Sequence, residues 1–242
     1  MKKHAAAAAV VLLFILSAIL YWIQITLFSD SHDTFFYMLQ DWAFLPVQIA
    51  LVTIVVDMII DSREKRERLS KSRMLASSFF SDCGTELLRM LLSCDANSGE
   101  LVRIFSVKGS WTAEDFASAE EAAAKTELDV KCTPDDLVKL RDFLLEKRLS
   151  TLVIASNPLL LEHEEFTDML WTVFHLSDEL SARGDLAALT IEGASHLDLD
   201  AQRTLRALIA NWLCCVSHLK KEYPYLFSLS VRENPLEMSR KA

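Results

Sequence analysis

The sequence predicts an all-α protein, in which an N-terminal hairpin of two transmembrane helices is followed by a cytoplasmic helical bundle. The chain has five glycines and five prolines in 242 residues, about a third of the roughly 12% that proteins average for these two residue types. Because so few residues suit tight turns, a turn-dense β-sandwich or barrel is excluded and long helices are favoured. Two apolar runs near the N-terminus, and amphipathic segments with helix-capping residues after them, complete the pattern.

The two apolar runs predict a transmembrane hairpin over residues 1–61. Residues 5–28 contain no charged side chain, and residues 43–60 contain one, Asp57. About 20 helical residues cross the hydrocarbon core of a bilayer, so both runs suffice if Asp57 lies near a membrane face. Pro46 is expected in the first turn of the second helix, where its missing N–H costs little. The mean hydropathy of +0.21 fits a membrane protein.

Basic residues flank the apolar runs. Lys2 and Lys3 precede the first run and six basic residues lie in 62–73, whereas the segment 29–42 between the runs has three aspartates and no Lys or Arg. Positive-inside bias therefore predicts cytoplasmic N- and C-termini and a location in the cell (inner) membrane. The alternative is that the first run is a cleaved signal peptide. It is less favoured, because the run is long and no clear A-x-A site closes it.

Polar residues within the predicted spans are Gln24, Gln48, Thr53 and Asp57. Intramembrane polar groups can line a pore or an ion path. They can also form hydrogen bonds between helices, with Asp57 reaching the interface. We favour the second interpretation because Asp57 lies only six residues before Arg63.

Residues 62–94 are expected to form a long juxtamembrane helix that continues from the second span. Opposite charges at i, i+4 support its first part. Apolar residues then recur at spacings of 3, 4 or 7, which is typical of a coiled-coil-like seam. This candidate interaction seam comprises Leu69, Ala76, Phe80, Cys83, Leu87 and Met90. The seam either packs within the domain or pairs between protomers. Gly84 argues against one unbroken helix, and the turn residues 95–99 end it.

Residues 95–242 are predicted to form a cytoplasmic helical bundle large enough for its own core. Apolar and polar residues alternate only weakly over 100–111, so the sequence assigns no secondary structure to this segment. A helix over 112–125 is expected to begin at Thr112, with Asp115 in a capping-box position. A helix over 133–156 is expected to begin with Thr133 as its cap, Pro134 at its first position and acidic residues in its first turn. A short strand over 151–155 is the alternative for the end of the second helix.

Two further amphipathic helices are expected, over 160–183 and from a cap at Asp198 or Asp200 to about Glu222. Pro224 ends the second and leaves an aromatic-rich turn, and the last dozen residues are expected to fray. The candidate docking turn comprises Tyr223, Tyr225 and Phe227. The favoured alternative is that these aromatic residues close the end of the bundle.

Charge and motifs narrow the function classes. Residues 62–73 carry a net charge of +4 and residues 74–242 carry −10, so a nucleic acid is disfavoured as partner. No nucleophile elbow, P-loop, dinucleotide fingerprint or Glu-x-x-His motif occurs, and the sequence therefore predicts neither an enzyme nor a cofactor. Asp168, His175 and Glu179 share a helix face and could bind a metal, but a solvated polar face explains them more simply.

The chain has an odd number of cysteines and no C-x-x-C motif. They are Cys83, Cys94, Cys132, Cys214 and Cys215. In a reducing compartment such residues are most simply core thiols. The adjacent pair Cys214–Cys215 could be redox-active or bind a soft metal, but neighbours on a helix point in different directions.

Three stretches carry a family resemblance: 41–69 (DWAFLPVQIALVTIVVDMIIDSREKRERL), 159–183 (LLLEHEEFTDMLWTVFHLSDELSAR) and 210–235 (ANWLCCVSHLKKEYPYLFSLSVRENP). Together they resemble a family of uncharacterised prokaryotic membrane-anchored proteins. The resemblance implies a two-span anchor with a helical cytoplasmic domain, and it brings no catalytic residue.

The sequence favours a membrane-anchored interaction or regulatory protein, a scaffold or sensor without catalysis. This hypothesis rests on the predicted anchor, the seam and the absence of catalytic motifs. Its partners would be the membrane and either a second copy of the chain or another protein. The alternative is an oligomeric pore or membrane-perturbing effector gated by the cytoplasmic domain. A metal- or ligand-binding enzyme is the third hypothesis.

Overall fold

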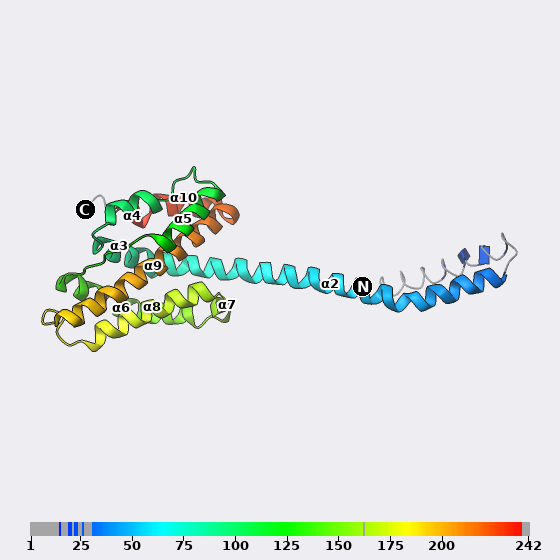
Figure 1. Ribbon diagram of the computed structural model, residues 1–242, viewed down its shortest axis with the longest axis horizontal. Coiled ribbons are helices and arrows are strands. Elements are labelled where there is room, and N and C mark those ends of the chain that lie inside the picture. The colour runs from blue at the N-terminus through cyan, green and yellow to red at the C-terminus, as the bar shows by residue number, and fades with distance from the viewer. Residues whose placement is uncertain are drawn as a thin grey trace. The chain divides into compact units, whose positions relative to one another are not determined.

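The computed structural model describes residues 15, 19, 20, 22, 23, 26, 31–161 and 163–238, and these are mostly helical (Figure 1). Within these residues there is no strand, and one isolated antiparallel bridge joins Asp95 to Val130. The all-α prediction is therefore confirmed for the described part of the chain. Contacts divide the chain into two compact units, Met1–Glu64 and Lys65–Ala242.

The helix α2 (Ser31–Phe79) begins earlier than expected. The sequence predicted a loop over 29–42, but residues 31–42 are helical, because they contain neither Gly nor Pro and Asp33 favours the helix start. Pro46 consequently lies inside α2 rather than in its first turn. Its φ angle suits a helix, but its missing N–H leaves one backbone carbonyl without its usual donor.

One stretch of α2, Phe35–Lys65, has the length and the apolar composition of a membrane-spanning helix. Among the described residues it is the single stretch that meets this test. Its side chains are exposed, including those of Gln48, Thr53 and Asp57. Gln24 and most of the predicted first span, 5–28, lie outside the described residues.

The predicted helix over 62–94 is continuous but changes its winding. After α2 comes a π-helical turn, η1 (Phe80–Gly84), and then α3 (Thr85–Ser93). The buried residues here come in pairs four apart: Phe79 and Phe80, Cys83 and Gly84, Leu87 and Leu88, Leu91 and Leu92. A step of four residues overshoots a full α-helical turn by about 40°, so three steps would carry this stripe about 120° around the helix. The wider π-turn takes up part of that rotation and keeps the pairs facing the core.

Gly84 lets two phenylalanine rings approach this turn. A Cβ atom at position 84 would lie 2.7 Å from Cε1 of Phe79 and 2.7 Å from Cδ1 of Phe80. Both rings are buried, and they pack edge-to-face with their centroids 5.4 Å apart. The glycine therefore marks a close approach of side chains rather than the end of a helix.

The next three helices are α4 (Ser98–Phe105), α5 (Ala113–Lys125) and α6 (Pro134–Ala155). The predicted capping box starts α5, and the predicted cap Thr133 starts α6, where it also forms a capping box with Asp136. The strand alternative for 151–155 is wrong, because these residues complete α6. Helix α4 occupies much of the unassigned segment, and its first residues lie within the predicted turn 95–99.

The helices α7 (Pro158–Leu161), α8 (Glu164–Ala182) and α9 (Ile191–Glu222) follow. Helix α8 packs against both α6 and α9, and α5 packs on α9 (Figure 1). The prediction that Asp198 or Asp200 caps α9 is wrong. Thr190 is the cap, since its side chain accepts a hydrogen bond from the backbone N–H of Gly193, and both aspartates lie inside the helix.

The C-terminal segment is more ordered than the sequence suggested. The predicted aromatic turn belongs to α10 (Pro224–Arg232), and α11 (Pro235–Met238) follows where fraying was expected. Asn234 between them is buried and donates to Oγ of Ser106 over 3.1 Å. The buried Leu236 packs with the core, so this end of the chain closes the domain.

Candidate functional site

The predicted interaction seam lies inside its own domain. Phe80 is 2% exposed and Leu87 0% exposed, and Ala76 and Cys83 are buried beside them. Met90 is half-buried, and the side chain of Leu69 lies outside the described part. These four described seam residues, Ala76, Phe80, Cys83 and Leu87, are thus used for packing within the domain, the first of the two alternatives.

The candidate docking turn is also mostly packed. Phe227 is buried, and Nζ of Lys220 lies 5.1 Å from its ring centroid. Tyr223 is half-buried with its ring 6.1 Å from that of His218, and Tyr225 alone of the three candidates is fully exposed. These positions favour the interpretation that the aromatic residues close the end of the bundle.

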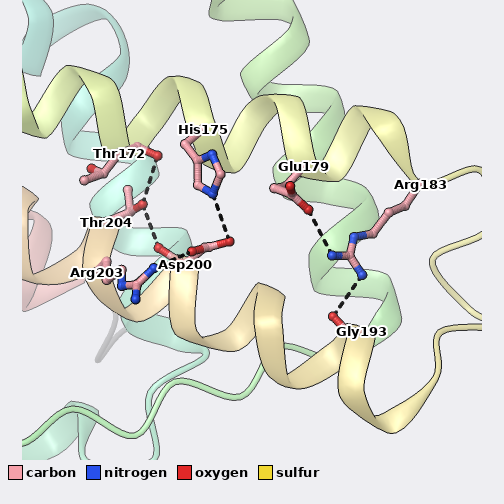
Figure 2. Close-up of polar contacts among 8 residues, drawn as sticks. All are labelled: Thr172, His175, Glu179, Arg183, Gly193, Asp200, Arg203 and Thr204. Atoms are coloured by element: carbon pink, nitrogen blue, oxygen red, sulfur yellow. Dashed lines mark hydrogen bonds and ion pairs between the residues drawn. The ribbon is translucent and has the colours of Figure 1, made fainter.

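Two of the three residues considered for a surface metal, His175 and Glu179, belong to polar contacts near the surface where α8 meets α9 (Figure 2). Nε2 of His175 lies 3.4 Å from Oδ2 of Asp200, and Arg183 donates to Glu179 over 2.9 Å. Asp200, whose side chain is nearly buried, also pairs with Arg203. In the described residues no group of three or more His, Cys, Asp and Glu side chains could hold a metal ion. The polar face of α8 thus helps to fix α8 against α9.

The adjacent cysteines of α9 have the character of core thiols. Burial raises the pKa of Cys214, and it raises the pKa of Cys215 to about 12. Burial likewise raises the pKa of Cys83 to about 11. Thiols with raised pKa values carry little thiolate at neutral pH, so these three are poor nucleophiles.

An exposed apolar surface on α6 and α8 is the strongest candidate for interaction. Leu149 is 74% exposed and Trp171 is 67% exposed. This surface, called here the α6–α8 face, comprises Leu145, Leu149, Leu152 and Val153 of α6 and Trp171 of α8. Contiguous apolar side chains of this size on the surface of a domain mark sites of association.

A hollow of about 360 Å³ adjoins the α6–α8 face. Leu152, Leu160, Leu170 and Phe174 are among the residues that line it with Trp171. Arg148 lies at its border and pairs with Asp178 over 2.7 Å. An apolar surface with an adjacent depression can accept side chains from a partner helix.

A second hollow, of about 330 Å³, lies beside the π-turn. Its floor includes Phe80 and Trp212, and its charged residues include Asp82 and Glu86. These carboxylates are already paired, with Lys147 and Arg89 respectively. Because polar and charged side chains make up much of its lining, this cleft is a weaker candidate for an apolar contact than the α6–α8 face.

Comparison with known proteins decides the family. Residues 2–60 match the family model described as "MJ1433, N-terminal helical domain", and residues 68–232 match "Uncharacterized protein MJ1433, C-terminal helical domain". The uncharacterized protein MJ1433 of Methanocaldococcus jannaschii is 35% identical over 236 residues, which cover 98% of this chain and 94% of that relative. The chain belongs to the MJ1433 family. No solved structure matches it.

The resemblance seen in the sequence is thereby confirmed at the level of an uncharacterised helical family. The two MJ1433 family domains divide the chain between residues 60 and 68, and the two compact units divide it between Glu64 and Lys65. Both divisions fall inside α2. The α6–α8 face lies in the C-terminal domain of the family.

Sequence reasoning missed the α6–α8 face, although α6 carried a signal. Helix α6 has one buried apolar stripe, with Leu137, Leu140 and Leu144, and further apolar residues at 145, 149 and 152. A helix with two apolar stripes needs packing partners on two sides to bury both of them. In this MJ1433-family bundle the domain buries the first stripe of α6, and the second stripe is left exposed.

Proposed function

We propose that this protein is a membrane-anchored scaffold or regulatory protein that acts by binding rather than by catalysis. In this proposal a hairpin of two spans holds both termini on the cytoplasmic side, and the helical domain associates with a second copy of the chain. The observation that carries the proposal is the exposed apolar α6–α8 face.

The anchor is supported by both apolar runs. Phe35–Lys65 has the length and composition of a spanning helix, and residues 5–28 form a second uncharged run. The basic residues of 62–73 would then lie next to anionic headgroups, where each adds roughly 1 kcal/mol of attraction. The acidic remainder of the chain would stand away from the lipid.

The charges of the domain favour a second copy of this chain as the molecule that binds the α6–α8 face. Residues 74–242 carry a net charge of −10, so two such domains repel each other unless they meet where charge is balanced. Residues 141–148 beside the face contain three basic and two acidic side chains. The three basic residues are paired within the chain, with Asp142, Asp82 and Asp178 respectively, so this border carries little net charge. In a two-fold dimer the same patch meets itself, and a charge-balanced border lets the apolar faces meet without strong repulsion. Tethering in one membrane also raises the effective concentration of the domains.

The test is the mass of the intact complex released in mild detergent, measured by native mass spectrometry. We expect a dimer for the full-length chain. Leu149→Asp should weaken dimerisation at least about tenfold, because it places an uncompensated charge in the apolar contact. Since Leu149 is exposed, the helical content of the variant should stay unchanged.

Ile191→Asp is the matched control, because Ile191 is 92% exposed and lies at the start of α9, outside the face. Equal dimer affinity for both variants, or a monomeric parent chain, would refute the proposed contact. A complex of four or more copies whose Asp57→Asn variant changes conductance in liposomes would favour the pore instead.

A further inference from the structure

Two cysteines far apart in the sequence lie beside each other at the junction of α3 and α6. Cys94 follows α3, and Cys132 lies just before α6. The backbone N–H of Lys131 donates to the carbonyl of Cys94 over 2.8 Å, and that of Ala96 donates to the carbonyl of Asp129 over 3.0 Å. These bonds flank the Asp95–Val130 bridge and hold the two segments side by side.

The side chains of the two cysteines are in contact. The Cys132 thiol hydrogen-bonds the sulfur of Cys94, and this bond lowers the pKa of Cys94. The same bond, followed by burial, raises the pKa of Cys132. Of the five cysteines, Cys94 is the one whose pKa is lowered, so it has the greatest tendency to form a thiolate.

Solvent can reach this pair. Cys94 is 8% exposed and Cys132 is half-buried, whereas Cys83 is almost fully buried. Cys132 is the more exposed member, so an oxidant approaches this pair more readily than it approaches Cys83. A disulfide would bring the two hydrogen-bonded sulfurs to a bond length of about 2.05 Å.

We propose that Cys94 and Cys132 form a reversible disulfide when the protein meets a hydroperoxide. The Cys94 thiolate attacks one oxygen of hydrogen peroxide and becomes a sulfenic acid, while the O–O bond breaks and the departing hydroxide takes up the proton that Cys94 had released, giving water. Oxidation of Cys94 removes the thiolate acceptor whose hydrogen bond raised the pKa of Cys132. The Cys132 sulfur then attacks the sulfenic sulfur, the S–S bond forms, and the sulfenic oxygen leaves as a second water with the Cys132 proton. Two thiols and one peroxide thus give one disulfide and two waters.

The disulfide would act as a switch. In a reducing compartment a thiol such as glutathione opens the bond by thiol–disulfide exchange, so it forms transiently. When closed, it would cross-link the start of α6 to the end of α3 and enclose α4 and α5 in a covalent loop. Closing a loop of this length should raise the melting temperature on the order of 5 °C.

The experiment oxidises the full-length chain in detergent with hydrogen peroxide and then blocks free thiols with N-ethylmaleimide. We expect Cys94 and Cys132 to lose labelling together, the mapped peptides to carry a disulfide between them, and dithiothreitol to restore labelling. Cys215→Ser should leave this result unchanged and serves as the control. A different pairing, or continued labelling of both cysteines, overturns the proposal.

A second variant tests the order of the two steps. In Cys132→Ala the sulfenic acid on Cys94 has no partner, so dimedone should trap it at that residue. Absence of a dimedone adduct on Cys94, with the fold retained by circular dichroism, overturns the assignment of Cys94 as the attacking thiol. This readout does not require Cys94 itself to be changed.

Discussion

The seam along α2, η1 and α3 and the α6–α8 face are both apolar stripes at helical spacing, yet their surroundings differ. Phe80 and Leu87 of the seam are enclosed by their own domain, with the ring of Phe80 5.3 Å from that of Trp212. Leu149 and Trp171 of the face remain exposed. Periodicity therefore reveals that a helix has an apolar side, and the packing of the other elements decides whether that side is free.

This difference separates stability from association. A residue in the seam should govern folding, whereas a residue in the α6–α8 face should govern contacts with another molecule. Substitutions in the seam should therefore lower the free energy of unfolding. Substitutions in the α6–α8 face should instead change the mass of the complex.

The largest effect on stability is expected in the seam. Leu87→Ala should lower the free energy of unfolding by about 2–5 kcal/mol, because the side chain is fully buried and its loss leaves a cavity. Denaturant unfolding of the full-length chain in detergent, followed by circular dichroism, measures it. A loss below about 1 kcal/mol would contradict the enclosed position of this residue.

A smaller loss is expected at the π-turn. In Gly84→Ala the new methyl group would collide with the rings of Phe79 and Phe80. Overpacking typically costs about 1–3 kcal/mol, and the better helix propensity of alanine offsets about 1 kcal/mol of this. Gly99→Ala in the first turn of α4 is the control, because no atom lies within 4 Å of the new Cβ. If both variants unfold at the same denaturant concentration, the close approach at Gly84 does not constrain the turn.

An ion pair links the seam to α6, and its effect should depend on pH. Hydrogen bonds from Ser150 and Lys147 hold the pKa of Asp82 below its ordinary value of 3.8. Asp82 therefore stabilises the fold above pH 3.8, and this contribution is lost as the pH falls from there through the folded pKa. The free energies of unfolding of the parent chain and of Asp82→Asn should differ at pH 6 and converge as the pH falls below the folded pKa of Asp82. A difference that stays constant with pH would contradict this role.

The smallest effect on stability is expected in the α6–α8 face. Leu149→Ala should change the free energy of unfolding by less than about 0.5 kcal/mol, because its side chain is exposed. The same variant should still weaken the dimer, which native mass spectrometry at several protein concentrations would show. A large loss of stability without any change in assembly would show that Leu149 packs within the domain, as the buried seam residues do.

Local signals made some elements predictable. The starts of α5 and α6 follow from Thr112 and Thr133, each with an aspartate three residues on, because capping is decided within one turn of helix. The start of α9 was missed because Asp198 and Asp200 resemble caps, whereas Thr190 fills that role. Asp200 instead pairs with His175 of a neighbouring helix, which no local pattern reveals.

The candidate sites depended on contacts between distant segments. The bridge between Asp95 and Val130 brings Cys94 and Cys132 together. No short sequence motif predicts such a contact. For the adjacent Cys214 and Cys215 the sequence favoured core thiols, and burial raises the pKa of both. Contacts between distant segments, rather than proximity in the chain, thus decide which cysteines can act together.

The π-turn at Phe80–Gly84 has a consequence for insertions and deletions. Deleting one residue while the turn rewinds as an ordinary α-helix would leave α3 nearly in phase, because the π-turn is what accommodates an extra residue. Adding one residue that no further π-turn absorbs would instead rotate all of α3 by about 100° relative to α2. The leucine pairs of α3 would then turn partly toward solvent although none of them had been changed. The residue count of this segment, as much as its composition, thus sets the angular phase between the two helices.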